Sequence, residues 1–294
     1  MLSWIVPKLR GSMTPEEEFA QKRAQAEQLI RQHAPARLQE QLIALLRPAI
    51  ALTATRTEDA QIAVGASKFG GAPDVPIDFE WPMWNGKPLG FLAQINLEEV
   101  APFDVEGLLP KSGLLSFFYD LKEQPWGRAE ERQGWRVFFS ETKSLFRNST
   151  KEGLNAASIA LSSSFTIPDD FECFPELGLT IDDCIRNNDW TLLDELAKFI
   201  PTLTNQMLGH ARTVQRHPGT EVESSWLDFQ NHGAAVDWEI IKAEADKWIL
   251  LFQMDSESNV DAMWGDCGTI YFMILPEDLA ARNFSNVWFT LQCT

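Results

Sequence analysis

The chain has 294 residues, of which 45% are hydrophobic and 23% are charged, and its formal net charge is -17. Such a chain can bury a large core without disulfides or metals, and its 19 Phe and 11 Trp exclude an intrinsically disordered protein. The negative charge argues against nucleic acid or an anionic membrane as a partner and favours a basic protein.

The negative charge is concentrated in one stretch. Residues 165–270 hold 20 acidic and 6 basic side chains, whereas residues 1–60 hold 7 acidic and 8 basic ones. The four cysteines form no C-x-x-C pair, and none has a histidine at zinc-ligand spacing. No apolar run approaches the roughly 20 residues of a membrane span, and the N-terminus has no signal-peptide pattern. We therefore expect a cytoplasmic protein that does not bind membranes.

The first sixty residues are predicted to be helical. Thr14, Pro15 and Glu17 form the capping-box start of a helix that runs to about His33. Pro35 begins a second helix whose leucines share one face, and these are Leu38, Leu42, Leu45 and Leu46. We predict an N-terminal helical hairpin over residues 1–60, preceding the main domain.

From residue 61 the pattern changes to short apolar runs separated by Gly, Pro and Asp turns, which is typical of strands. The predicted strands are Gly90–Ile95, Gly113–Tyr119, Trp135–Phe139, Trp248–Met254, Thr269–Leu275 and Val287–Gln292. Fewer helices are expected, at Trp190–Ile200 and Trp238–Asp246. Strands outnumber helices of crossover length, which favours an α+β fold with mixed or antiparallel sheets and short helices.

An internal repeat divides this domain, residues 61–294. An apolar strand with an embedded glutamine, an acidic turn and a glycine that opens an aromatic strand occur around Gln94 and again around Gln253. We predict a duplicated body with pseudo-two-fold symmetry, with halves at about residues 61–150 and 205–294. A glutamine inside an apolar strand must satisfy its amide, and we expect it to bond to neighbouring backbone.

Several blocks of sequence resemble the YwqG-like family of bacterial proteins. They are Ser67–Pro76 (SKFGGAPDVP), Phe79–Pro82, Pro88–Asn96 (PLGFLAQIN), Met207–His210, Leu251–Asp255 and Met263–Phe272 (MWGDCGTIYF). The resemblance covers about residues 62–294 and implies a duplicated α+β body. Because the family is a domain of unknown function, it transfers no catalytic residue. Proteins of such families can be encoded beside toxins as immunity proteins.

No catalytic residue, metal site or cofactor is predicted. Nucleophile motifs are absent, and Gly65–Gly71 lacks the Lys and the helix start of a phosphate loop. His210, His217 and His232 have no neighbour pattern that would fix a tautomer. The calcium-like run Asp255–Asp266 has Val260 where the loop needs Gly.

The first functional hypothesis is a protein-binding module, and most specifically an immunity protein that neutralises a basic toxin domain such as a nuclease. An acidic surface gives fast, steered association with such a partner and can cover its positive groove. The predicted contact residues are surface acids and one aromatic anchor: Asp169, Asp170, Glu172, Asp182, Asp183, Glu221, Glu223 and Trp226.

The second hypothesis is a small-ligand-binding protein or an enzyme with an unfamiliar site. Its ligand would occupy a cleft between the two repeats, lined by Trp81, Gln94, Gln253, Trp264 and Asp266. A thermal-shift screen with metabolites and divalent metals distinguishes the two hypotheses, because a bound ligand stabilises the folded state.

Overall fold

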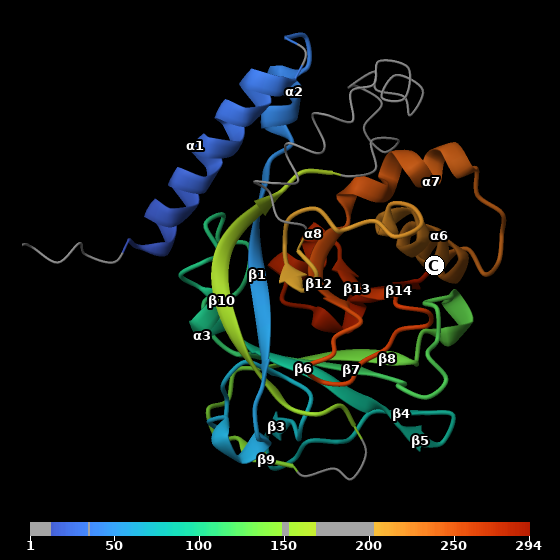
Figure 1. The fold of residues 1–294 in the computed structure, drawn as a ribbon. Coiled ribbons are helices and arrows are strands. Elements are labelled where there is room, and N and C mark those ends of the chain that lie inside the picture. Colours follow the sequence, from blue (N-terminus) through green and yellow to red (C-terminus); the bar gives the residue numbers. More distant parts are fainter. Residues whose placement is uncertain (1–12, 35, 149–152, 169–202) are drawn as a thin grey trace, which may run out of the picture.

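The computed structural model describes residues 13–34, 36–148, 153–168 and 203–294. Within them one ten-stranded sheet runs through the molecule (Figure 1), in the order β14-β13-β12-β11-β1-β10-β2-β6-β7-β8. Its strands are β1 (Arg47–Arg56), β2 (Lys68–Phe69), β6 (Gly90–Asn96), β7 (Leu114–Tyr119), β8 (Trp135–Ser140), β10 (Ala157–Thr166), β11 (Gln206–Met207), β12 (Ile249–Asp255), β13 (Thr269–Ile274) and β14 (Trp288–Gln292). Two small ribbons join β3 (Asp74–Val75) to β9 (Phe146–Arg147) and β4 (Met83–Trp84) to β5 (Lys87–Pro88).

All of the described strand pairings are antiparallel. On one side of the central pair β1–β10 lie the short β11 and the meander β12-β13-β14, and on the other side lie the short β2 and the meander β6-β7-β8. Each meander has a register shift in its first strand, between Phe91 and Ala93 in β6 and between Leu250 and Phe252 in β12. A buried glutamine, Gln94 or Gln253, directly follows each shift.

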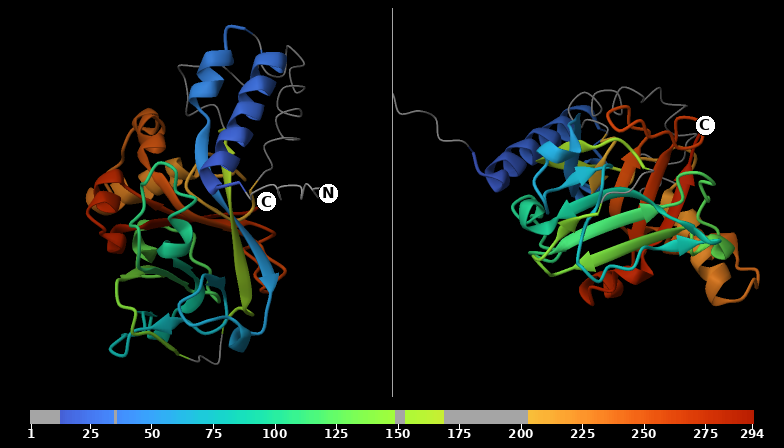
Figure 2. Two further views of the ribbon diagram at one scale, coloured as in Figure 1. Left: turned by 90° about the vertical axis from the view of Figure 1, so that its left-hand side faces the viewer. Right: turned by 90° about the horizontal axis from the view of Figure 1, so that it is seen from below.

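The two meanders face one another through aromatic rings. The ring centroid of Phe117 in β7 lies 4.7 Å from that of Phe252 in β12 and 5.1 Å from that of Phe272 in β13. Tyr119 and Phe289 meet at 4.6 Å, and all five side chains are fully buried. Burying one such side chain contributes about 2–3 kcal/mol. The sheet therefore curls around one apolar core into a nearly closed, barrel-like body (Figure 2).

Different elements cover the outer faces of the two meanders. Over β6 and β7, the chain that precedes the β4–β5 ribbon packs Phe79 and Trp81 against Phe91 and Phe118. Beside β13 and β14 lies α6 (Pro218–Gln230), which contacts α7 (Trp238–Glu244) and the turn η5 (Ala245–Lys247). In Figure 2 α6 and α7 project from the sheet as a lobe.

The N-terminal helices α1 (Pro15–His33) and α2 (Gln39–Ala44) lie at one end of the long strands β1 and β10 (Figure 1). The predicted capping box is present, since Thr14 and Glu17 each accept a hydrogen bond from the other's backbone N–H. Ile30, Leu42 and Leu46 pack with Phe165 of β10 in a separate apolar cluster. The other short helices within the described residues are α3 (Leu97–Val100), α8 (Pro276–Ala280), η1 (Asp59–Gln61), η2 (Ala129–Glu131) and η6 (Phe284–Asn286).

Secondary structure agrees with most of the sequence predictions. The six predicted strands correspond to β6, β7, β8, β12, β13 and β14, and the helix predicted from Trp238 is α7. The helical prediction is wrong from Arg47 to Arg56, which forms β1, because Ile50 and Leu52, two residues apart, both pack into the sheet core. The strand β10 and the helix α6 were not predicted. The helix predicted over Trp190–Ile200 lies outside the described residues.

For the fold class, the predicted combination of antiparallel sheet and short helices is confirmed. In the part of the chain that the structure describes, no helix is both long enough and apolar enough to span a bilayer.

Candidate functional site

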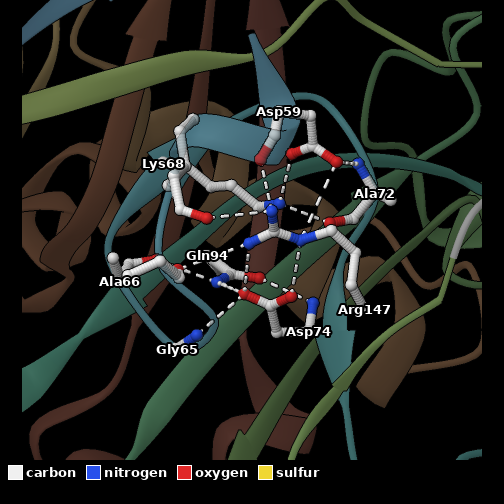
Figure 3. Close-up of polar contacts among 10 residues, drawn as sticks. Asp59, Gly65, Ala66, Lys68, Ala72, Asp74, Gln94 and Arg147 are labelled. Carbon is white, nitrogen blue, oxygen red and sulfur yellow. Dashed lines mark hydrogen bonds and ion pairs between the residues drawn. The ribbon is translucent and has the colours of Figure 1, made fainter. Parts of the chain in front are cut away.

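Gln94 lies at the centre of a buried polar cluster (Figure 3). Its Nε2 donates to the carbonyl of Ala66 at 2.8 Å and to Oδ2 of Asp74 at 2.7 Å, and its Oε1 accepts from the backbone N–H of Asp74 at 2.8 Å. Both donors and the acceptor of the amide are therefore used by the protein. Bonding to the surrounding chain, as expected for a buried glutamine, leaves this amide no free group for a ligand.

Four charged side chains complete this cluster. The guanidinium of Arg147 donates to both carboxylate oxygens of Asp74, at 2.9 and 3.2 Å, and the ammonium of Lys68 donates to Asp59 at 2.7 Å. Lys68 also donates to the carbonyl of Ala72, and its side chain is fully buried. The cluster thereby connects β2, β3, β6, β9 and η1, and Figure 3 shows its side chains turned toward one another.

The charge states of the cluster follow from burial and pairing. Burial lowers the pKa of Lys68, against the opposing effects of Asp59 and Asp74. Burial alone would raise the pKa of Asp74, but hydrogen bonds from Arg147, Gly65 and Gln94 outweigh it and hold that pKa below its ordinary value. The hydrogen bond to Asp74 raises the pKa of Arg147. The cluster is a set of mutually neutralising pairs, which is a structural arrangement and does not supply a general acid or base.

Gln253 occupies a similar environment in the second meander. Its Oε1 accepts from the backbone N–H of Arg212 at 2.9 Å, and its Nε2 donates to the carbonyls of Leu203 and Thr204 at 3.1 and 3.2 Å. Arg212 pairs with Asp255 at 2.8 Å. This glutamine is also fully buried and saturated, so it too holds a loop against the sheet.

The helix α6 carries three of the residues predicted to contact a partner. Glu221 accepts from Thr290 at 2.7 Å and from Gln292 at 3.1 Å. The prediction of Glu223 as a surface acid is wrong: its side chain is 1% exposed, because Lys247 and the indole N–H of Trp248 occupy its two oxygens. Trp226 is half-buried, with the Lys247 ammonium 4.9 Å from its ring centroid.

The α6–α7 lobe, residues 218–244, exposes large apolar side chains. Phe229 is 49%, Trp238 40% and Ile240 54% exposed. The guanidinium of Arg216 lies 5.5 Å from the ring centroid of Trp238 and covers one of its faces. Neighbouring acids on the same lobe are Asp228, Asp237, Glu239 and Glu244, against the single base Lys242. The sequence pattern predicts a helix from Trp238 but does not indicate that these apolar residues are exposed, since exposure depends on what packs against α7.

A groove of about 800 Å³ lies between the start of β6 and the turn after β7. Its walls include Trp81, Leu89, Leu121 and Leu154, and two lysines, Lys87 and Lys122, stand beside them. We call it the Trp81 groove.

His210 and His217 are both buried in the fold. His210 is 4% exposed and its Nε2 lies 2.8 Å from the carbonyl of Leu45, while His217 accepts from the backbone N–H of Gly219 at the start of α6. His232 is exposed. Within the described ranges, no three or more His, Cys, Asp or Glu side chains gather where they could hold a metal ion.

Comparison with known proteins assigns a family. The family model "Domain of unknown function (DUF1963)" matches residues 67–293, which is most of the chain. The chain belongs to this family. No curated protein matches the sequence. The matched DUF1963 region begins at β2 and ends after β14, so α1, α2 and β1 precede it.

Within the DUF1963 domain, the five residues predicted to line an inter-repeat cleft are not brought together as lining of the Trp81 groove. Trp81 lines it, but Gln94, Gln253, Trp264 and Asp266 do not. Trp264 is 1% exposed and its indole N–H donates to the carbonyl of Asp255, whereas Asp266 is exposed. The predicted partner contacts Asp169, Asp170, Glu172, Asp182 and Asp183 lie outside the described residues.

Proposed function

We propose that this DUF1963 protein is a protein-binding module whose partner is basic, and most specifically an immunity protein that neutralises a basic toxin domain. The observation that carries the proposal is the α6–α7 lobe, where Phe229, Trp238 and Ile240 are exposed next to carboxylates. The same proposal includes membership of the YwqG-like family, which the sequence resembles.

The exposed apolar residues support docking to a protein. Single exposed apolar residues are normal on any surface, but here three large ones fall within twelve consecutive residues. Aromatic side chains are the residues that most often carry binding energy at interfaces. Trp238 suits this role because the Arg216 guanidinium on one face restrains its ring before a partner arrives.

The negative charge of this protein indicates the class of its partner. Residues 203–270 contain 11 acidic and 4 basic side chains, and the whole chain carries -17. A surface of this kind attracts a basic protein, accelerates its association and repels phosphate-bearing ligands. A nuclease toxin domain, with a positive groove for phosphate, is the partner class that matches both the charge and the apolar anchors.

The proposal is tested by affinity capture of the tagged full chain from its native host, first at low salt and then with a high-salt wash. Capture of one basic protein that the wash releases is the expected result. Trp238→Ala is expected to weaken its binding by at least tenfold, as loss of an interface hot spot does. Glu239→Lys is expected to lower the association rate.

Two substitutions away from the lobe serve as matched controls. Ile77→Ser removes an apolar side chain that is 87% exposed, and Glu106→Lys reverses an exposed acid. Both should leave capture unchanged. Equal loss in the control and lobe variants, or an association rate that does not respond to salt, would refute this proposal.

A further inference from the structure

We infer that the Trp81 groove binds a small amphipathic ligand that has an apolar body and an oxyanion head, a carboxylate or a phosphate. This site is separate from the α6–α7 lobe: its walls come from the chain around β4–β7 and from Leu154, which precedes β10. Its volume of about 800 Å³ is in the range of pockets that hold small organic ligands.

The apolar wall of the groove is held in place before any ligand enters. The indole N–H of Trp81 donates to the carbonyl of Leu89 at 2.9 Å, and its ring packs edge-on against Phe118 at 5.4 Å. The side chain of Leu121 packs against the backbone of Gly90, where an added Cβ would lie 2.4 Å from it. Fixed apolar walls reduce the entropy that binding costs, and they select an aliphatic or aromatic body.

The charged groups beside this wall select the head. Lys122 is exposed and has no ion pair among the described residues. Lys87 pairs with Glu123 at 3.2 Å, but both side chains are more than half exposed, so the pair contributes little and can open.

The carboxylate of Asp120 also lines the groove, where the backbone of the turn holds it. Its Oδ1 accepts from the backbone N–H groups of Lys122 and Glu123, both at 2.9 Å, and closes the turn. The two ammonium groups outnumber this single carboxylate in the groove lining, so together with the apolar wall they are complementary to an anionic head. In a chain with a net charge of -17, such a pair is a local exception to the general field.

The test is isothermal titration of the full chain with defined probes at one ionic strength. Octanoate and octyl phosphate carry both features, acetate and inorganic phosphate carry only the head, and hexanol carries only an apolar body. We expect saturable one-to-one binding of octanoate or octyl phosphate, at least tenfold tighter than any of the other three probes. The probe that binds more tightly identifies the head group as a carboxylate or a phosphate.

Variants locate the site. Leu121→Asp and Leu154→Asp each place a charge in the wall and should weaken binding by more than tenfold, and the second covers the case in which the first unfolds. Lys122→Gln should weaken it three- to tenfold, whereas Lys111→Gln, at an exposed lysine outside the groove, should not change it. The indole N–H resonance of Trp81, assigned with Trp81→Phe, should shift on binding.

Three outcomes would overturn the inference. If neither octanoate nor octyl phosphate shows saturable binding, the groove is not a small-molecule site. The same negative result is expected if the groove is instead a surface that a partner protein covers. Equal affinity for hexanol and octanoate would show that the groove does not recognise an oxyanion head. Unchanged binding in both wall variants, provided that they are folded, places the ligand elsewhere.

Discussion

The side-chain amides of Gln94 and Gln253 each form hydrogen bonds with several backbone groups of the chain, as water would. Replacing Gln94 by Leu leaves the Asp74 N–H and the Ala66 carbonyl without this partner, and it removes one of the three hydrogen bonds to Asp74 Oδ2. Because each unsatisfied buried group costs about 1–3 kcal/mol, we expect Gln94→Leu to lower the free energy of unfolding by about 3 kcal/mol or more. Gln253→Leu removes the hydrogen bonds to Arg212, Leu203 and Thr204 and should also lower stability, but by less, because Thr204 is exposed to water.

Urea denaturation of the two variants and the parent measures this effect. Gln230→Leu is the control, since this glutamine is exposed at the end of α6 and should change stability by less than about 0.5 kcal/mol. A small effect of Gln94→Leu, comparable with that of the control, would show that the polar cluster is not an important determinant of stability.

His210 makes stability depend on pH. Burial, with smaller contributions from Arg47 and His217, lowers the pKa of His210 from 6.5 to about 3. The unfolded chain therefore takes up a proton near pH 6.5 that the folded chain does not. The contribution of neutral His210 to the free energy of unfolding is fully present above pH 6.5 and is lost as the pH falls toward 3. Between pH 6.5 and 5 the loss should be about 1.5 kcal/mol.

The contribution of His210 is isolated by measuring urea midpoints of the parent and His210→Gln across this pH range. The variant should start less stable, but the difference between the two proteins should shrink toward pH 5. His232→Gln, at an exposed histidine, should run parallel to the parent. A constant difference between parent and His210→Gln would contradict the assignment.

At the scale of elements, the turns after β2 and β11 determine how the sheet is assembled. Each short strand is followed by two residues in the left-handed region, Gly70 and Gly71 after β2 and Leu208 and Gly209 after β11. At Gly70 an added Cβ would lie 2.0 Å from the carbonyl oxygen of Asn155, whereas at Gly86, which also has positive φ, it would meet nothing within 4 Å.

Comparing these two glycines separates steric overlap from backbone strain. Gly86→Ala should lower the free energy of unfolding by only about 1–2 kcal/mol, the cost of a left-handed alanine. Gly70→Ala pays the same strain and must also displace the backbone at Asn155, so we expect a loss of more than about 3 kcal/mol or no folded protein. Thermal and urea unfolding of both variants measure the difference, and equal losses would exclude a tight approach at Gly70.

Element type was predictable wherever apolar runs were long and bounded by turns, as in β6, β7 and β12–β14. The strand β10 was missed because its Ser-rich sequence has no apolar run, and it is a strand because β1 pairs along its whole length. The burial of Glu223 could not be inferred either, since it depends on Lys247 and Trp248 about 25 residues away. Exposure of Trp238 and the walls of the Trp81 groove likewise follow from packing between distant segments.

At the scale of the whole molecule, β1 connects the two meanders. It forms ten residue pairs with β10 and also pairs with β11, although it precedes the region that the family model matches. The helices α1 and α2 instead contribute a separate apolar cluster at the end of these strands. A chain that keeps β1 should therefore behave differently from one that begins at residue 61, the predicted domain boundary.

Two truncations test the role of β1. We expect residues 46–294 to unfold cooperatively in urea, with lower stability and some self-association, because loss of α1 and α2 uncovers Phe165. Residues 61–294 should show no cooperative transition, because β10 and β11 lose the strand that lies between them and their backbone groups have no replacement partner. Near-ultraviolet circular dichroism and size-exclusion chromatography measure both properties. A cooperative transition in residues 61–294 equal to that of residues 46–294 would mean that β1 is dispensable and that the domain begins where the sequence pattern changes.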